Sequence, residues 1–82
     1  MIAAYNDSLI NNPVKKLICL TELDRNISYT GIVESFNKLK GKIYVSLLNV
    51  NVFEYSSSTP LYDLPKINLS RPEDNIFIEE IQ

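Results

Sequence analysis

The sequence predicts an all-β fold in which a short N-terminal helix precedes a five-stranded, strongly bent small barrel. From residue 14 onward, β-branched and aromatic residues form runs that polar breaks separate, which is typical of successive strands. Two of these runs are irregular, since one contains a glycine and the other changes its apolar parity, and both irregularities are typical of bent strands. The length of 82 residues fits one domain, so we expect a single domain over residues 1–82, with the barrel over 14–81.

Residues 5–12 are predicted to form the short helix. Asn6, Asp7 and Ser8 have short acceptor side chains that suit an N-cap, and the helix must end before Pro13. One or two turns are not stable alone, so we expect this helix to pack against the rest of the domain.

The first two strands are predicted over residues 14–21 and 27–36, with a polar turn between them. The run 14–21 is apolar on both faces, which is typical of a strand that is covered on both sides, as in a closed barrel. The run 27–36 has Gly31 at its middle, where glycine weakens a strand unless the chain bends or another backbone comes close. We therefore expect a kink at Gly31.

A basic hairpin at residues 37–42 leads into a third strand over residues 43–55. Gly41 is free to take a positive φ in the hairpin. The apolar residues of the strand follow two alternating series, which are Ile43, Val45 and Leu47 and then Leu48, Val50 and Val52. Since the parity changes between the two series, we expect a β-bulge and a long, bent strand.

The remaining chain is predicted to contain one long loop and two short strands. Residues 56–65 are rich in serine and proline and are predicted to form a variable loop. Strands are predicted over residues 66–70 and 75–81, joined by a tight turn at residues 71–74.

The composition excludes several classes of chemistry within one chain. The sequence has no histidine and one cysteine, and its net charge is −2. Disulfide frameworks, Cys/His zinc sites and histidine-dependent catalytic triads are thereby excluded. We expect no enzyme activity, no catalytic residues, no cofactor and no metal site.

The N-terminus has no basic segment followed by an apolar stretch of signal-peptide length, and the longest apolar run, 17–20, is too short to span a membrane. We expect an intracellular protein, cytoplasmic or nuclear in a eukaryote, that does not contact a membrane.

Three segments together resemble the Sm and Sm-like (LSm) family of small, SH3-like β-barrels. They are residues 29–37 (YTGIVESFN), 44–50 (YVSLLNV) and 67–76 (INLSRPEDNI). The resemblance implies an N-terminal helix followed by a five-stranded, bent barrel, and it covers nearly the whole chain. The family ends its fourth strand with Arg-Gly, whereas Pro72 stands in the glycine position here.

The resemblance also implies a base-binding pocket, which this sequence keeps only in part. In RNA-binding members, an acidic residue and an asparagine of the loop between strands two and three form this pocket together with the arginine after strand four. Here Asn37 stands in the acidic position, residues 42–44 contain no asparagine, and Arg71 matches the arginine. Lys38, Lys40 and Lys42 would add phosphate contacts, although a solvated hairpin tip is the alternative reading. The candidate RNA-binding residues are therefore Asn37, Lys38, Lys40, Lys42 and Arg71, and we expect weak RNA binding.

A retained barrel with an incomplete pocket is similar to the Gemin-type subunits of the SMN complex, which assembles small nuclear ribonucleoproteins. In that reading the partner-binding edge comprises Ile67, Leu69, Ile76 and Ile78 on the last two strands. The alternative is a closed barrel whose edges are already paired.

The leading functional prediction is a non-enzymatic Sm-like protein-interaction subunit that acts as a scaffold in ribonucleoprotein assembly through strand-edge pairing. Its partner would be another Sm-like subunit or a second copy of the chain. Two alternatives stay open, namely an RNA-binding LSm ring subunit and a small bacterial or phage immunity or adaptor protein.

Overall fold

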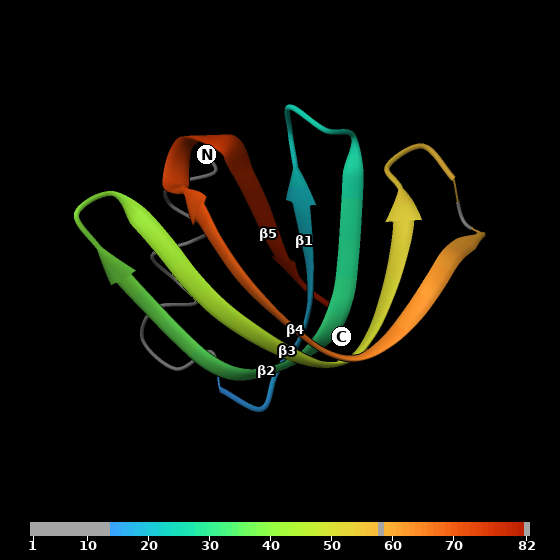
Figure 1. Ribbon diagram of the computed structural model, residues 1–82, viewed down its shortest axis with the longest axis horizontal. Helices are drawn as coiled ribbons and strands as arrows, with labels where there is room; N and C mark the ends of the chain where they lie inside the picture. The colour runs from blue at the N-terminus through green and yellow to red at the C-terminus, as the bar shows by residue number, and fades with distance from the viewer. Residues whose placement is uncertain (1–13, 58, 82) are drawn as a thin grey trace.

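A computed structural model describes residues 14–57 and 59–81 and shows one antiparallel five-stranded sheet (Figure 1). The elements are β1 (Leu17–Glu22), β2 (Ile27–Leu39), β3 (Lys42–Glu54), β4 (Pro60–Pro72), the 3-10 helix η1 (Glu73–Asn75) and β5 (Ile76–Glu80). The strand order is β4-β3-β2-β1-β5. The all-β class and the bent five-stranded sheet are confirmed, whereas the helix predicted at residues 5–12 lies outside the described residues.

The sheet bends where Gly31 of β2 faces the bulge of β3. A Cβ atom on Gly31 would lie 2.9 Å from the carbonyl oxygen of Leu48, so only glycine allows the two backbones to approach this closely. Asn49 has a φ of 54°, and the β2–β3 register shifts between Thr30 and Ile32. The predicted kink and the predicted bulge are both confirmed, and they form one structural feature.

This bend divides the sheet into two arms, as the curvature of β2, β3 and β4 in Figure 1 shows. We call the part that contains the β2–β3 turn the hairpin arm; it comprises residues 33–48 and 66–72. The other part, the base arm, comprises residues 17–31, 50–54, 60–64 and 76–80.

The hydrophobic core fills the inner face of the bent sheet. Its buried side chains are Ile18, Leu20, Tyr29, Val33, Ile43, Val45, Leu47, Val50, Val52, Leu69, Ile76 and Ile78. The prediction that the first strand is covered on both faces is correct only in part. Ile18 and Leu20 are fully buried on one face, whereas on the other face Thr21 is buried, Cys19 is half-buried and Leu17 is 42% exposed. The strand also starts later than predicted, at Leu17, since Lys15 has a φ of 71° and interrupts the extended chain.

The predicted loop over residues 56–65 is wrong in its second half, because β4 begins at Pro60. Leu64 and Tyr62 of β4 pair with Val50 and Val52 of β3. The two prolines that suggested a loop are tolerated because Pro60 is the first residue of β4 and Pro65 has no paired partner opposite the bulge of β3.

The connection between β2 and β3 is a two-residue turn. Lys40 and Gly41 have φ values of 53° and 75°, and positive φ at both positions is the type I′ geometry that matches the twist of a hairpin. The positive φ predicted at Gly41 is confirmed, but residues 37–39 belong to β2 rather than to a loop. Among the described residues, no helix is long and apolar enough to cross a membrane.

Candidate functional site

The sheet has two open edges within the described part of the chain. Strands β4 and β5 are the outermost strands, and they do not pair with each other. The alternative of a closed barrel with paired edges is therefore wrong for this structure. Unpaired strand edges readily pair with another chain.

The hydrogen bonds of β5 show which of its backbone groups face outward. The N–H of Ile81 donates to the carbonyl of Leu17 at 2.9 Å, and hydrogen-bonded pairs alternate along an antiparallel ladder. The backbone groups of Ile76, Ile78 and Glu80 consequently point away from β1, toward the open edge.

The same argument identifies the outward groups of β4. The N–H of Glu73 donates to the carbonyl of Gly41 at 2.8 Å, in register with the β3–β4 ladder. By the same alternation, the backbone groups of Lys66, Asn68 and Ser70 point away from β3. The β5 edge therefore presents three residues whose backbone groups face outward, and the β4 edge presents three within the hairpin arm, where the Ser70 carbonyl accepts a hydrogen bond from Arg71.

The four residues predicted to form the partner-binding edge lie on the two edge strands, but their side chains face the core. Ile76 and Ile78 are fully buried and Leu69 is buried, while Ile67 is half-buried against the core. Of the four, Ile76 and Ile78 turn their backbone groups outward. Sequence reasoning missed the three outward residues of β4 in the hairpin arm, although their polar side chains, which alternate with the apolar ones, were the available signal.

The two edges differ in charge. Strand β4 contains Asp63, Lys66 and Arg71, but Arg71 pairs with the buried Glu22, so the other two charges of β4 sum to zero. The segment of η1 and β5 contains four acidic residues and no basic residue. Two acidic β5 edges repel each other, whereas a β5 edge meets no such repulsion at a β4 edge.

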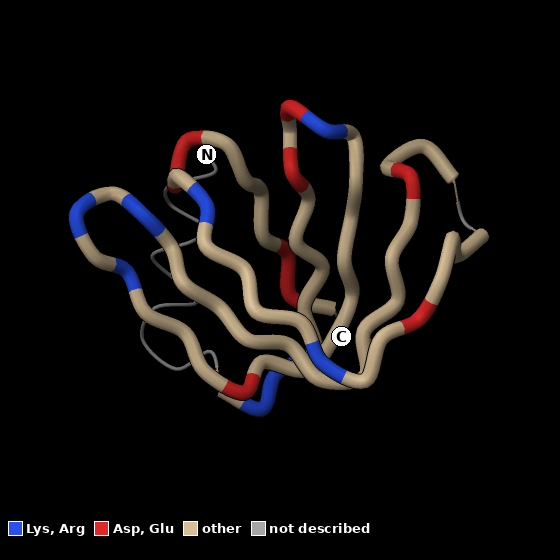
Figure 2. Tube along the Cα trace, in the orientation of Figure 1, with Lys and Arg blue, Asp and Glu red and all other residues tan. Residues whose placement is uncertain are grey.

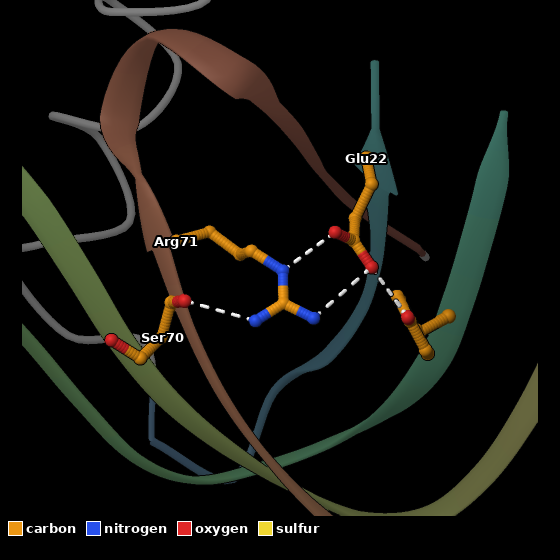
Figure 3. A network of polar contacts seen from close by, with 4 residues as sticks. Glu22, Ser70 and Arg71 are labelled. Atoms are coloured by element: carbon orange, nitrogen blue, oxygen red, sulfur yellow. Dashed lines mark hydrogen bonds and ion pairs between the residues drawn. The ribbon is translucent and has the colours of Figure 1, made fainter. Parts of the chain in front are cut away.

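A buried ion pair joins β4 to β1 across the interior of the sheet (Figure 3). Arg71 Nε donates to Glu22 Oε1 at 2.5 Å, and an Nη of the same guanidinium lies 3.4 Å from Oε2. The hydroxyl of Tyr29 donates to Oε2 at 2.5 Å, and the other Nη of Arg71 donates to the carbonyl of Ser70 at 2.9 Å. Glu22 is fully buried, so these hydrogen bonds replace the ones that water would donate to its carboxylate.

The neighbours of Glu22 decide its charge state. Burial alone would raise its pKa, but hydrogen bonds from Arg71 and Tyr29 and the positive charge of Arg71 outweigh burial and lower the pKa below its usual value. Burial and the hydrogen bond to Glu22 raise the pKa of Tyr29 to about 12. The pKa of Arg71 is raised, chiefly by its hydrogen bond to Glu22. At neutral pH the cluster therefore holds one anion, one cation and one neutral phenol.

These shifts predict that the stability of the fold falls in acid. A carboxylate with a lower pKa in the folded chain than in the unfolded chain stabilises the fold above its unfolded pKa, so the contribution of Glu22 is complete above about pH 5. The contribution is lost as the pH falls through the lowered folded pKa. We expect urea denaturation to give Glu22→Gln a lower free energy of unfolding than the wild type at pH 7, and this difference should shrink toward about pH 3. An equal difference at both pH values contradicts the conclusion that the charged form of Glu22 stabilises the fold.

Only some of the candidate RNA-binding residues lie on one surface. Lys38 Nζ forms an ion pair with Glu73 Oε2 at 2.6 Å, while Lys40 and Lys42 are exposed at the hairpin tip, whose basic residues Figure 2 marks. Arg71 lies near this tip but directs its guanidinium inward to Glu22. Asn37 lines a hollow on the outer face with Tyr44 and Ser70. Neighbours along a strand point to opposite faces, so Asn37 does not join Lys38.

The described residues contain no group of three or more Cys, Asp or Glu side chains that is placed to hold a metal ion. Cys19 is half-buried, and burial raises the pKa of its thiol. A raised pKa keeps the thiol protonated at neutral pH and lowers its reactivity.

Comparison with solved structures shows that the fold is similar to that of an Sm protein. The structure of the Sm protein of Pyrococcus abyssii in complex with a uridine heptamer is similar over 90% of this chain and 94% of that chain, with a TM-score of 0.68 and 15% sequence identity. No protein-family model and no curated protein sequence matches the chain. The Sm-like fold that the sequence predicted is thereby confirmed at the level of structure.

Proposed function

We propose that this protein is a non-enzymatic Sm-like subunit that assembles head to tail with copies of itself, the β4 edge of one molecule joining the β5 edge of the next. The observation that carries the proposal is the pair of unpaired edges at opposite ends of one sheet. Because the two edges differ, their contact is heterologous, and a heterologous contact builds a ring when its rotation closes.

The charge and size of the domain support the same proposal. The segment of η1 and β5 is acidic, whereas the β4 charges that are not paired with Glu22 sum to zero, so two β5 edges repel each other and unlike edges do not. A domain of 82 residues buries a modest core, and edge pairing would add buried surface.

Replacing Asn68 with proline is expected to convert the assembly into monomers. The N–H of Asn68 faces the open edge, so proline removes a donor that a partner needs while the β3–β4 ladder keeps its hydrogen bonds. Light scattering after size-exclusion chromatography measures the change. Asn68→Ala is the matched control, because it loses the same side-chain contact with Ser46 but keeps the N–H, and it should assemble like the wild type.

Two outcomes decide against this proposal. A wild type that stays monomeric at high concentration removes the assembly proposal altogether. An assembled Asn68→Pro variant shows that the chain assembles through another surface.

A scaffold role in ribonucleoprotein assembly, as a Gemin-type subunit, is a narrower proposal for the same edges. It requires that the edges capture a different Sm-like chain in preference to a second copy. Mixing the purified protein with Sm subunits and measuring the mass of the product separates the two cases. An immunity or adaptor role instead requires a partner outside this fold.

RNA binding by the assembly is a second candidate function. It is supported by the exposed Lys40 and Lys42 at the hairpin tip, next to the end of β4, and the similar Sm protein was solved with a uridine heptamer. Arg71 is committed to Glu22, so phosphate contacts from the lysines would supply most of the affinity.

Titration with a uridine heptamer at two salt concentrations tests this candidate. Two phosphate contacts to a single strand give a slope of about −1.4 for log K against log salt, so affinity should fall about 25-fold between about 20 mM and about 200 mM salt. The variant Lys40→Gln/Lys42→Gln should bind more weakly and show a shallower slope. Absence of binding at the lower salt concentration excludes the candidate.

A further inference from the structure

We propose that Glu22 and Arg71 are positioning residues for the assembly, and that their ion pair fixes the angle between the two sheet edges and thereby the number of subunits. This inference rests on the proposed head-to-tail assembly. The role of this pair would be to set the angle between the β4 and β5 edges, which neither edge can set by itself.

The ion pair connects parts of the sheet that the ladder leaves far apart. Arg71 belongs to β4 in the hairpin arm and Glu22 to β1 in the base arm, and in the strand order β2 and β3 lie between them. Figure 3 shows the two side chains meeting in the space between the strands. The pair therefore restrains how far the two arms open about the bend at Gly31.

Each partner of the ion pair lies beside one of the edges. Glu22 is directly opposite Ile76, the first residue of β5 with outward backbone groups. Arg71 follows Ser70, and its guanidinium donates to the Ser70 carbonyl at 2.9 Å, a group that the β3–β4 ladder leaves unpaired. A rotation of the guanidinium would therefore shift backbone groups at both edges.

The chemistry of the pair suits it to fix an angle. A guanidinium that meets a carboxylate through two nitrogens is held in one plane, unlike an ammonium group. Glu22 is fully buried and takes a further hydrogen bond from Tyr29, so its carboxylate cannot turn toward water. Buried ion pairs contribute little net stability compared with apolar packing, and defining one geometry is a better-attested role for them.

Small changes in this angle are enough to change the subunit number. In a closed ring of n subunits, the rotation between neighbours is the full turn divided by n, so successive rings of five to eight subunits differ by roughly 6 to 12° per contact. Loosening the arms by a few degrees should therefore favour another ring size or a mixture of sizes.

Native mass spectrometry of the full chain tests the inference. The wild type is expected to give one dominant stoichiometry, and Glu22→Gln and Arg71→Lys are expected to reduce its share below half in favour of other sizes. Glu34→Gln is the matched control, because it breaks the ion pair between Glu34 and Lys66, 2.8 Å apart within the hairpin arm, and should keep the wild-type stoichiometry.

The outcomes separate this inference from the proposed function. A monomeric wild type defeats the proposed function. A wild type that assembles, with both variants folded by circular dichroism and identical to it in stoichiometry, overturns the inference alone. If neither variant folds, the inference is also overturned, since the pair is then a requirement of the fold rather than of the edge angle.

Discussion

Replacing Arg71 with methionine is expected to lower the free energy of unfolding by about 3 kcal/mol, because the fully buried carboxylate of Glu22 loses its charged partner. Methionine keeps most of the side-chain volume, so loss of packing contributes little. Tyr29 still donates one hydrogen bond to Glu22, and the Arg71 side chain is 27% exposed, so the value belongs at the lower end for buried pairs.

The double variant Glu22→Gln/Arg71→Met is the control for this prediction. It contains no buried charge, so we expect it to recover most of the loss and to lie within about 1 kcal/mol of the wild type. Urea denaturation should be measured on the Asn68→Pro background, because assembly makes the apparent stability depend on concentration. If the double variant is less stable than Arg71→Met, the penalty does not arise from an unpaired carboxylate.

The bend of the sheet could be predicted from the sequence because its causes are local. A glycine in the middle of an apolar strand and a parity change after Leu47 each identify an irregularity within a few residues, and both are confirmed at Gly31 and Asn49. Alternation did not show that Leu69, Ile76 and Ile78, which we predicted at a partner-binding edge, have their side chains in the core.

The ion pair could not be predicted because nothing local connects its members. Glu22 and Arg71 are 49 positions apart, and Glu22 follows an apolar run, where a polar residue is typical of the start of a turn. Resemblance to RNA-binding proteins suggested a role at an open pocket for Arg71, whereas the carboxylate of Glu22 holds its side chain in the interior. A buried charge is costly without a partner, but the sequence does not say which residue provides one.

The bend itself can be tested by the same substitution at the two glycines. Gly31→Ala is expected to cost about 3 kcal/mol, since the new Cβ would lie 2.9 Å from the backbone oxygen of Leu48 and 3.1 Å from the Cβ of Leu47. Neither atom lies at the end of a flexible side chain, so the two strands must separate at the bend. This cost is a large fraction of the stability of a small domain, which is about 5 to 10 kcal/mol.

Gly41→Ala is the matched control, because its Cβ would meet nothing within 4 Å and only the φ of 75° opposes the change. That conformational penalty is about 1 kcal/mol. Urea denaturation of both variants therefore separates crowding from backbone strain. Equal losses at the two positions would mean that close approach of β2 and β3 does not set the bend. A larger loss of unfolding free energy at Gly31 than at Gly41 would show that the bend requires a residue without a Cβ atom at position 31. The placement of both edges would then depend on this glycine.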